Sequence, residues 1–249
     1  MAEIILFLMY NNIVNGGEEK VEYTYGNEDL SFSKYLSKCF LWMFLGLLAT
    51  FATAAFFSYT GLFITIFANM GIMFTLVISI VEIVLVISVS RVVFKLDTKK
   101  ALGLFFAYSV INGITLASIF YLYDLTSIIY TFLATAGVFG AMAFIGYTTK
   151  LDLSKLGTFL SIGLIVMLIA GIILMFAFNE KVYAIYSIFG IALFMLITAY
   201  DIHIIKRMYY HANTYEQRNA LSIYGALQLY LDFINIFIRL LALFARNRD

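Results

Sequence analysis

The stretch LQLYLDFINIFIRLLALF, residues 227–244, is apolar enough to cross a lipid bilayer, yet it carries four strongly polar side chains. They are Gln228, Asp232, Asn235 and Arg239, and their spacing of four, three and four residues places all of them on one face of a helix. A carboxylate and a guanidinium are costly in lipid unless they are paired or hydrated. We therefore expect this face to point into the interior of a helical bundle.

The composition of the whole chain indicates an integral membrane protein. Of its 249 residues, 63% are hydrophobic and 12% are charged, and the mean hydropathy is +0.95. Globular domains are about 45–50% apolar and about 25% charged. The net charge of +1 gives no indication of a nucleic-acid partner, so the expected surroundings are membrane lipids. One cysteine, Cys39, excludes an intrachain disulfide, and no Cys/His cluster predicts a structural metal or a tightly bound cofactor.

Apolar runs of about 20 residues, the length that a bilayer core requires, recur along the chain. We expect a polar, acidic and mobile segment at residues 1–33 and a single multi-pass membrane domain at residues 34–249. Because the chain contains no proline, its helices are expected to be mostly continuous. The fold is predicted to be all-α, with seven transmembrane helices at residues 38–59, 70–93, 101–122, 126–148, 156–178, 182–205 and 222–245.

The seventh segment is diluted by its four polar residues, which leaves two interpretations of its course open. It either crosses the membrane completely or re-enters on the side from which it came. A complete crossing would place Arg246 and Arg248 outside the cell, against the usual distribution of basic residues.

Lysine and arginine are concentrated in alternate connections. Lys34 and Lys38 precede the first segment, and Lys150 and Lys155 lie between the fourth and the fifth. Further basic residues lie between the second and third segments and after the sixth, whereas the opposite connections hold only Lys181. The positive-inside rule therefore predicts a cytoplasmic N-terminus. Abundant Ile, Phe, Tyr and Asn favour a bacterial source, and hence a bacterial inner or plasma membrane.

Small residues recur at helical spacing in the fourth segment, where Ala136 pairs with Gly140 and Gly137 with Ala141. This spacing lets helix backbones approach closely. We expect it to mark a central helix of the bundle, with a homodimer contact as the alternative.

Two aspartates are predicted to meet inside the membrane. Asp201 lies five residues before Lys206, roughly 7 Å inside the cytoplasmic edge, and Asp232 lies roughly 10 Å deep if its helix enters near Gly225. The sixth and seventh segments are joined by a short connection, so they are expected to be antiparallel neighbours. Arg91 ends the second segment close to the same level. Glu82 is nine residues earlier on that segment, roughly 13 Å deeper.

Two close carboxylates in a low-dielectric site are not both ionised cheaply, so they retain a shared proton over some pH range. The pair Asp201 and Asp232 would then act as a pH-dependent latch, with Asn235 and Gln228 as hydrogen-bonding support. Two negative charges would also attract a calcium ion through oxygen ligands. The alternative is that the aspartates only brace the bundle through neighbouring hydroxyls. Arg239 is expected to extend to the membrane interface.

Four motifs resemble those of one known family. They are YSVINGITLASIFYLY at 108–123, KLDLSKLG at 150–157, AYDIHIIK at 199–206 and LYLDFINIFIRLLAL at 229–243. From about residue 34 to the C-terminus, the chain resembles the Bax inhibitor family, also called the transmembrane Bax-inhibitor-motif family, in its bacterial form.

The resemblance implies a seven-helix bundle with the last helix at its centre and a pH-sensitive leak with calcium as the permeant ion. It also implies that the aspartates at Asp201 and Asp232 are the pH sensor. Arg91 is the nearest candidate for an arginine of the closed-state latch. Glu82 matches an acidic position that would lie on the ion path.

Three other functions are alternatives to a leak channel. An intramembrane aspartyl protease would also place aspartates on a sixth and a seventh helix, but this chain lacks its Gly-x-Gly-Asp motif and any proline for its Pro-Ala-Leu motif. We therefore expect a protein that is not an enzyme. A non-conducting regulator that binds other membrane proteins, of the cell-death or quality-control type, remains the alternative. An ion-coupled transporter would need an inverted repeat or a broken helix pair, and neither is visible.

Overall fold

The computed structural model describes residues 29–149, 153 and 156–244 of the chain. The predicted mobile segment falls mostly on residues 1–28, outside the described residues, and its last five residues form the start of the first helix described. The helices are α2 (Asp29–Tyr59), α3 (Leu62–Met70), α4 (Ile72–Phe94), α5 (Thr98–Leu116), α6 (Ile119–Leu122), α7 (Leu125–Thr148), α8 (Leu156–Phe176), α9 (Glu180–His211) and α10 (Tyr215–Phe244).

Seven of these helical segments are long and apolar enough to cross a membrane, which confirms the expected all-α membrane bundle. Because the hydrocarbon core supplies no water to bond the backbone, helices that satisfy their own N–H and C=O groups are the structures that can span it. The expectation of mostly continuous helices holds, apart from a short break between α5 and α6. The chain also forms α3, a helix that was not predicted from the sequence. Two glycines with positive φ, Gly61 at 71° and Gly71 at 54°, separate α3 from α2 and α4.

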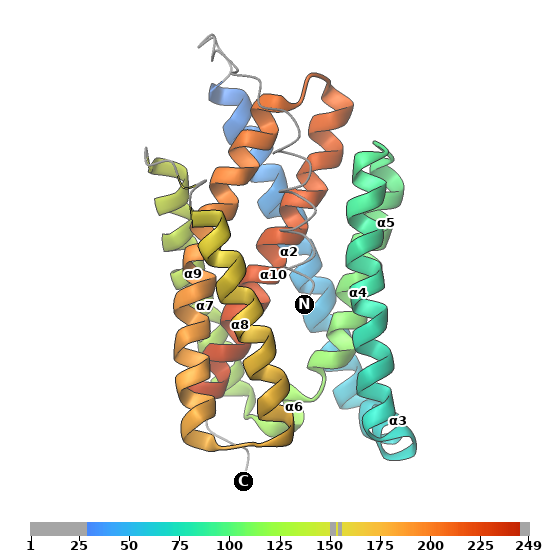
Figure 1. Ribbon diagram of the computed structural model, residues 1–249. Helices are drawn as coiled ribbons and strands as arrows, with labels where there is room; N and C mark the ends of the chain where they lie inside the picture. Colours follow the sequence, from blue (N-terminus) through green and yellow to red (C-terminus); the bar gives the residue numbers. More distant parts are fainter. Residues whose placement is uncertain (1–28, 150–152, 154–155, 245–249) are drawn as a thin grey trace.

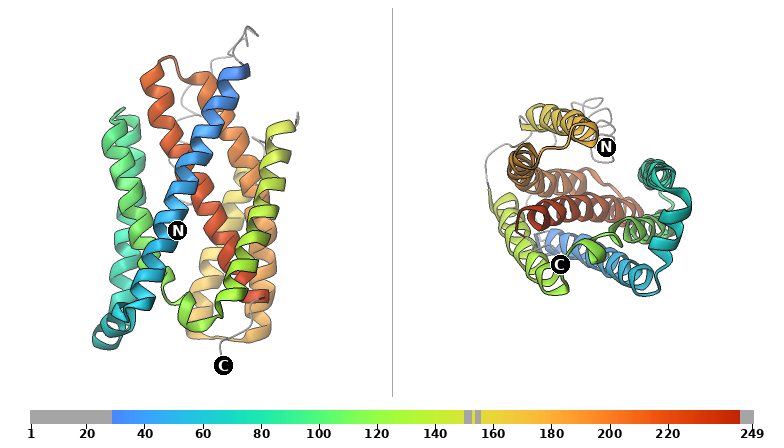
Figure 2. Two further views of the ribbon diagram at one scale, coloured as in Figure 1. Left: turned by 180° about the vertical axis from the view of Figure 1, so that it is seen from behind. Right: turned by 90° about the horizontal axis from the view of Figure 1, so that it is seen from below.

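Helix α10 lies at the centre of the bundle, as the family resemblance implied. It packs against α2, α4, α5, α7 and α9, and the view along the bundle shows it surrounded by them (Figure 2). In the most apolar stretch of α10, 67% of the residues are buried, compared with 44% or less in the other spans. The helix is unbroken from Tyr215 to Phe244 and runs from one end of the bundle to the other (Figure 1). The structure therefore favours a complete crossing over re-entry.

Helices α9 and α10 are longer than predicted, with 32 and 30 residues. At about 1.5 Å per residue they exceed the roughly 30 Å thickness of a bilayer core. Their connected ends, together with the start of α2, project beyond the other helices (Figure 1). There the hairpin is fixed to the start of α2, where Lys38 Nζ donates to Asn219 Oδ1 at 2.6 Å. The lengths predicted from hydropathy were too short because the projecting ends of these helices carry charged residues, which a search for apolar membrane spans leaves out.

The expectation that α7 is a central helix because of its small residues is wrong. Gly137 and Gly140 are exposed, and nothing lies within 4 Å of a Cβ built at either position. The close approach of α7 is made instead by Gly146, where an added Cβ would lie 2.9 Å from Ala199 Cα on α9. The small residues therefore indicated correctly that α7 packs closely against another helix. The close contact is on the face of Gly146, however, and not on the face of Gly137 and Gly140.

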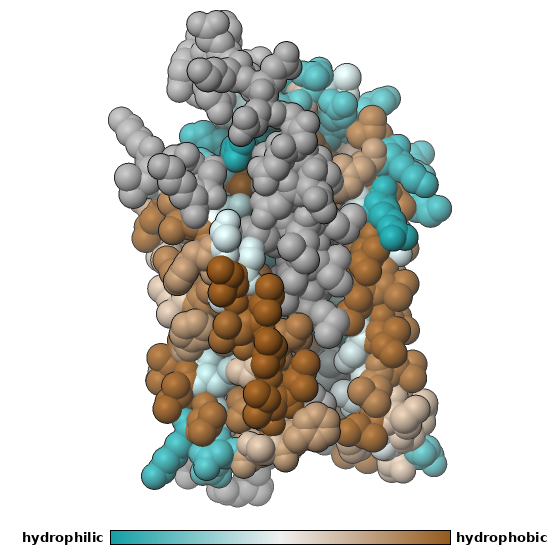
Figure 3. Space-filling view, viewed as in Figure 1, coloured by the Kyte–Doolittle hydropathy of each residue, from teal (hydrophilic) through white to brown (hydrophobic). Residues whose placement is uncertain are grey.

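The outer surface matches a membrane environment. On the part of the visible face that is not grey, apolar residues predominate in the middle and hydrophilic residues gather towards the two ends (Figure 3). Large hydrophobic side chains such as Ile80, Phe144 and Ile185 are more than half exposed. This arrangement, with a polar stripe inside and an apolar surface outside, positions the candidate site along the central helix.

Candidate functional site

Asp201 and Asp232 are both buried, on neighbouring helices. Asp201 lies on α9 with 6% of its side chain exposed, and Asp232 lies on α10 with 0% exposed. The two helices run in opposite directions and pack against each other along their length. The structure thus shows both aspartates buried on two helices that pack together, and their pairing stays a prediction.

The levels of the two aspartates follow from a contact nearby. A Cβ built at Gly225 on α10 would lie 3.1 Å from Ile205 Cγ1 on α9, so these two residues face each other. Asp201 is four residues from Ile205 and Asp232 is seven from Gly225, both away from the connecting turn. At about 1.5 Å per residue, their backbones differ in level by roughly 4–5 Å, less than one helical turn.

Glu82 on α4 is half-buried and accepts hydrogen bonds from α5. Its Oε1 accepts from Thr115 Oγ1 at 2.7 Å and from Asn112 Nδ2 at 3.4 Å. A carboxylate placed in a membrane helix without such donors would be strongly destabilising. The structure therefore provides Glu82 with a specific polar environment inside the bundle.

This environment continues as a chain of hydrogen bonds to the central helix. Asn112 Oδ1 accepts from the Tyr230 hydroxyl at 3.0 Å, and that hydroxyl is 2.6 Å from Thr50 Oγ1 on α2. Because the Thr50 hydroxyl has one proton, it donates either to Tyr230 or to the Ser109 carbonyl, which is 2.9 Å from Thr50 Oγ1. The network thus links α2, α4, α5 and α10.

The network and the aspartate pair lie on two sides of α10. Tyr230 precedes Asp232 by two residues, which is a rotation of about 200° and a rise of about 3 Å on a helix. Four residues of the network were not predicted from the sequence: Tyr230, Asn112, Thr115 and Thr50. A signal was available, because Asn112 and Thr115 are polar residues three apart in a predicted membrane helix.

The other residues predicted to act with the aspartates are Arg91, Asn235 and Gln228. Arg91 is exposed near the C-terminal end of α4, nine residues and about 13 Å along the helix from Glu82. Asn235 Nδ2 donates to the Leu231 carbonyl of its own helix at 2.9 Å. Gln228 is buried, and its Oε1 has no hydrogen-bond partner among the described residues. The proposed roles of these three residues in the latch stay predictions.

Calcium binding by Asp201 and Asp232 also stays a prediction. Among the described residues, no group of three or more His, Cys, Asp or Glu side chains is arranged to hold a metal ion. The carboxylate oxygens of the two aspartates are hard ligands of the kind that calcium uses.

Comparison with known proteins places the chain among bacterial membrane proteins. The family model described as "Inhibitor of apoptosis-promoting Bax1" matches residues 32–249. The "Inner membrane protein YbhL" of Escherichia coli strain K12 is 37% identical over 217 residues, which are 86% of this chain and 92% of that protein. An uncharacterized protein of Borreliella burgdorferi is 37% identical over 87% of this chain and 94% of its own length. An uncharacterized membrane protein of Streptococcus pyogenes serotype M1 is 33% identical over 90% of this chain and 97% of its own length.

Proposed function

The chain belongs to the Bax inhibitor family, and on that premise we propose that it is a calcium-permeable leak of the cell membrane, gated by protonation of Asp201 and Asp232. The observation that supports this proposal is the burial of both aspartates on two antiparallel helices that pack together, at backbone levels that we place less than one helical turn apart.

The gating argument rests on the electrostatics of a buried carboxylate pair. In a low-dielectric interface two nearby carboxylates repel strongly, so one of them retains a proton until the pH is high enough to remove it. The shared proton allows the two groups to hydrogen-bond and holds α9 against α10. Loss of that proton leaves two negative charges that repel each other and attract a cation. The α9–α10 interface therefore has two states that differ by one proton.

The path for calcium is proposed to follow the polar side chains around α10. Calcium prefers six to eight oxygen ligands, which carboxylates, hydroxyls and carbonyls supply. Glu82, Thr115 and Tyr230 offer such oxygens on one side of the central helix, and the aspartates offer them on the other. Intramembrane acidic groups with polar neighbours are typical of ion pathways. The placement of these groups in the bundle interior, away from the apolar surface, supports the proposal.

The test is calcium flux into liposomes that contain the purified protein and a calcium-sensitive dye, measured over a range of pH. We expect the wild-type flux to change in a step as the aspartate pair titrates. Asparagine mimics a neutral carboxyl group in size and shape. The combined changes Asp201→Asn and Asp232→Asn should therefore remove the step and hold the flux near its acidic value at every pH.

Matched controls are available on the same two helices. Glu180 on α9 and Glu216 on α10 are exposed, so Glu180→Gln and Glu216→Gln each remove one carboxylate without touching the pair. Both variants should retain the wild-type pH profile. An unchanged profile in the Asp→Asn variant would contradict the latch. A wild-type protein that is incorporated but passes no calcium at any pH would refute the leak and favour a non-conducting regulator of other membrane proteins.

A further inference from the structure

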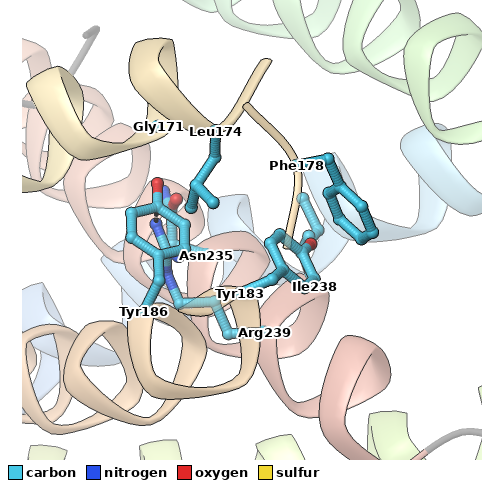
Figure 4. Close-up of a pocket in the computed structure, with 8 residues that line it drawn as sticks. All are labelled: Gly171, Leu174, Phe178, Tyr183, Tyr186, Asn235, Ile238 and Arg239. Atoms are coloured by element: carbon cyan, nitrogen blue, oxygen red, sulfur yellow. Dashed lines mark hydrogen bonds between the residues drawn. The ribbon is translucent and has the colours of Figure 1, made fainter. Parts of the chain in front are cut away.

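Arg239, the last polar residue of the central helix, is not used by the aspartate pair or by the Glu82 network. It lies beside a cavity of about 280 Å³ between α8, α9 and α10. Figure 4 shows Arg239 and Asn235 from α10 near Tyr186 from α9, with Leu174 from α8 beside them. Gly171 of α8 lies against the Tyr186 hydroxyl, which is 2.9 Å from a Cβ built at that glycine. None of the described residues that line this cavity is acidic.

The guanidinium of Arg239 is held between two aromatic rings of α9. Its Cζ is 4.6 Å from the centre of the Tyr186 ring and 5.4 Å from the centre of the Phe194 ring. Between these rings lies Gly190, and a Cβ added there would overlap Arg239 Cδ and Nε and lie 2.7 Å from Cζ. Residues 186, 190 and 194 are four apart and therefore share one face of α9. An aromatic–glycine–aromatic seat thus fixes the position of the guanidinium.

The hydrogen-bonding capacity of this guanidinium is largely unused within the described part of the chain. A guanidinium has five N–H donors. One of them, on Nη2, donates to the Tyr186 hydroxyl at 3.4 Å. Arg239 Nε is buried and has no hydrogen-bond partner among the described residues. Stacking on aromatic faces satisfies the charge only in part, because it does not use the in-plane N–H donors.

The cavity lies near one end of the bundle, where a helix that crosses a bilayer is expected to reach the membrane interface. Arg239 is five residues from the end of α10, and Tyr183, which also lines the cavity, is three residues from the start of α9. These separations correspond to roughly 5–8 Å along the helices. Phe178, another lining residue, is 67% exposed, so the cavity reaches the outer surface. Lipid headgroups begin where the hydrocarbon core, roughly 30 Å thick, ends. A cavity this close to the end of the bundle is therefore within reach of a headgroup.

We propose that this cavity binds a phosphate oxyanion through the stacked guanidinium of Arg239. A planar guanidinium matches the geometry of a phosphate with two parallel hydrogen bonds. The depth of the site and the apolar lining around it favour the headgroup of an anionic phospholipid, whose chains would lie along the exposed surface of α8 and α9. Soluble phosphate has the same oxyanion chemistry and is the second source.

The experiment measures binding of phosphatidylglycerol to the full-length protein in a neutral detergent, by native mass spectrometry and by the thermal unfolding midpoint. Diacylglycerol with the same chains is the control for tail binding, and inorganic phosphate tests the soluble source. We expect phosphatidylglycerol to bind and to raise the unfolding midpoint, with diacylglycerol having little effect. Arg239→Gln should weaken phosphatidylglycerol binding by roughly tenfold or more, because it removes a charge-assisted hydrogen-bond pair.

Two further variants make the result specific to the seat. Lys181→Gln removes an exposed cation at the same end of α9 and should leave binding unchanged. Gly190→Ala retains every charge but displaces the guanidinium, so it should weaken binding as Arg239→Gln does. If Arg239→Gln does not fold, Arg239→Lys replaces it, and its binding should also fall because an ammonium lacks the planar donor pair.

The possible results distinguish a phospholipid headgroup from soluble phosphate as the ligand, and one of them would contradict the proposal. Inorganic phosphate that binds as tightly as the lipid, and depends on Arg239, would assign the site to a soluble anion. Lipid binding that depends on Arg239 while inorganic phosphate is ineffective would assign it to the headgroup. Equal phosphatidylglycerol binding by the wild type and by the folded Arg239 and Gly190 variants would overturn the proposal.

Discussion

Gly146 on α7 lies so close to Ala199 on α9 that no residue larger than glycine fits at position 146 without a shift of the backbone. A Cβ at position 146 would overlap the Ala199 carbonyl oxygen and lie 2.9 Å from Ala199 Cα. These are backbone atoms, so they have no rotamer with which to make room. Because Ala199 lies two residues before Asp201, this contact also fixes the part of α9 that carries the aspartate.

Gly146→Ala is therefore expected to destabilise the protein by about 1–3 kcal/mol, the usual cost of overpacking a tight interface. The matched control is Gly140→Ala on the same helix, where nothing lies within 4 Å of the new Cβ. That variant should lose no stability, since alanine is the better helix former. Thermal unfolding midpoints in detergent measure both effects, and equal midpoints for the two variants would contradict the close contact.

At the scale of helices, one hydroxyl connects three elements of the bundle. Tyr230 on α10 donates to Asn112 on α5 and contacts the hydroxyl of Thr50 on α2, and all three side chains are buried. Asn112 carries the connection on to Glu82 on α4. The packing of α2, α4 and α5 around the central helix therefore includes a specific polar tie besides apolar contacts.

Tyr230→Phe removes that tie and leaves buried acceptors with fewer donors. We expect a loss of about 1–3 kcal/mol in the free energy of unfolding. Tyr209→Phe is the control, because the Tyr209 ring is equally buried but its hydroxyl has no hydrogen-bond partner among the described residues. Thermal unfolding of the two variants provides the comparison. The tie would be refuted if Tyr230→Phe unfolded at the same temperature as Tyr209→Phe.

The elements that the sequence predicted well are those marked by hydropathy alone. Runs of apolar residues located all seven spans, since a lipid environment requires about 20 such residues in each. The same criterion missed α3, which is short, and the projecting ends of α9 and α10, which are charged. Hydropathy records which segments enter lipid, whereas the ends of helices depend on capping and on packing against other elements.

The candidate site was predictable where a residue was conspicuous in its own segment. Asp201, Asp232 and Glu82 are acidic groups in apolar helices. The structure shows the two aspartates buried and Glu82 hydrogen-bonded to Thr115, and their functional roles stay predictions. Tyr230 was not conspicuous, because tyrosine is common in membrane helices as an interfacial anchor. The seat of Arg239 was also missed, although YSIFGIALF at 186–194 carries its aromatic–glycine–aromatic spacing. Such features depend on which helix faces which, and one sequence does not determine that.

The whole molecule has two ends of different charge. At the end where α2 begins and α9 turns into α10, the described chain carries many basic side chains, while the other end carries Lys181 and Arg239. The basic residues of the first end are Lys34, Lys38, Arg91, Lys95, Lys99, Lys100, Lys206, Arg207 and Arg218. Lys206 lies 5.9 Å from the Phe32 ring, which confirms that the end of α9 and the start of α2 are adjacent. An asymmetry of this kind predicts which end faces the cytoplasm.

We expect the basic end to be cytoplasmic, and single cysteines can test this in intact cells. Lys99→Cys at the start of α5 and Lys181→Cys at the start of α9 place one exposed thiol at each end. The native Cys39 is fully buried, so the unaltered protein is the control for background labelling. A membrane-impermeant maleimide should label Lys181→Cys in whole cells and Lys99→Cys only after the membrane is permeabilised. The reverse pattern would show that the bundle is inserted the other way round, with Arg239 and its cavity in the cytoplasmic leaflet.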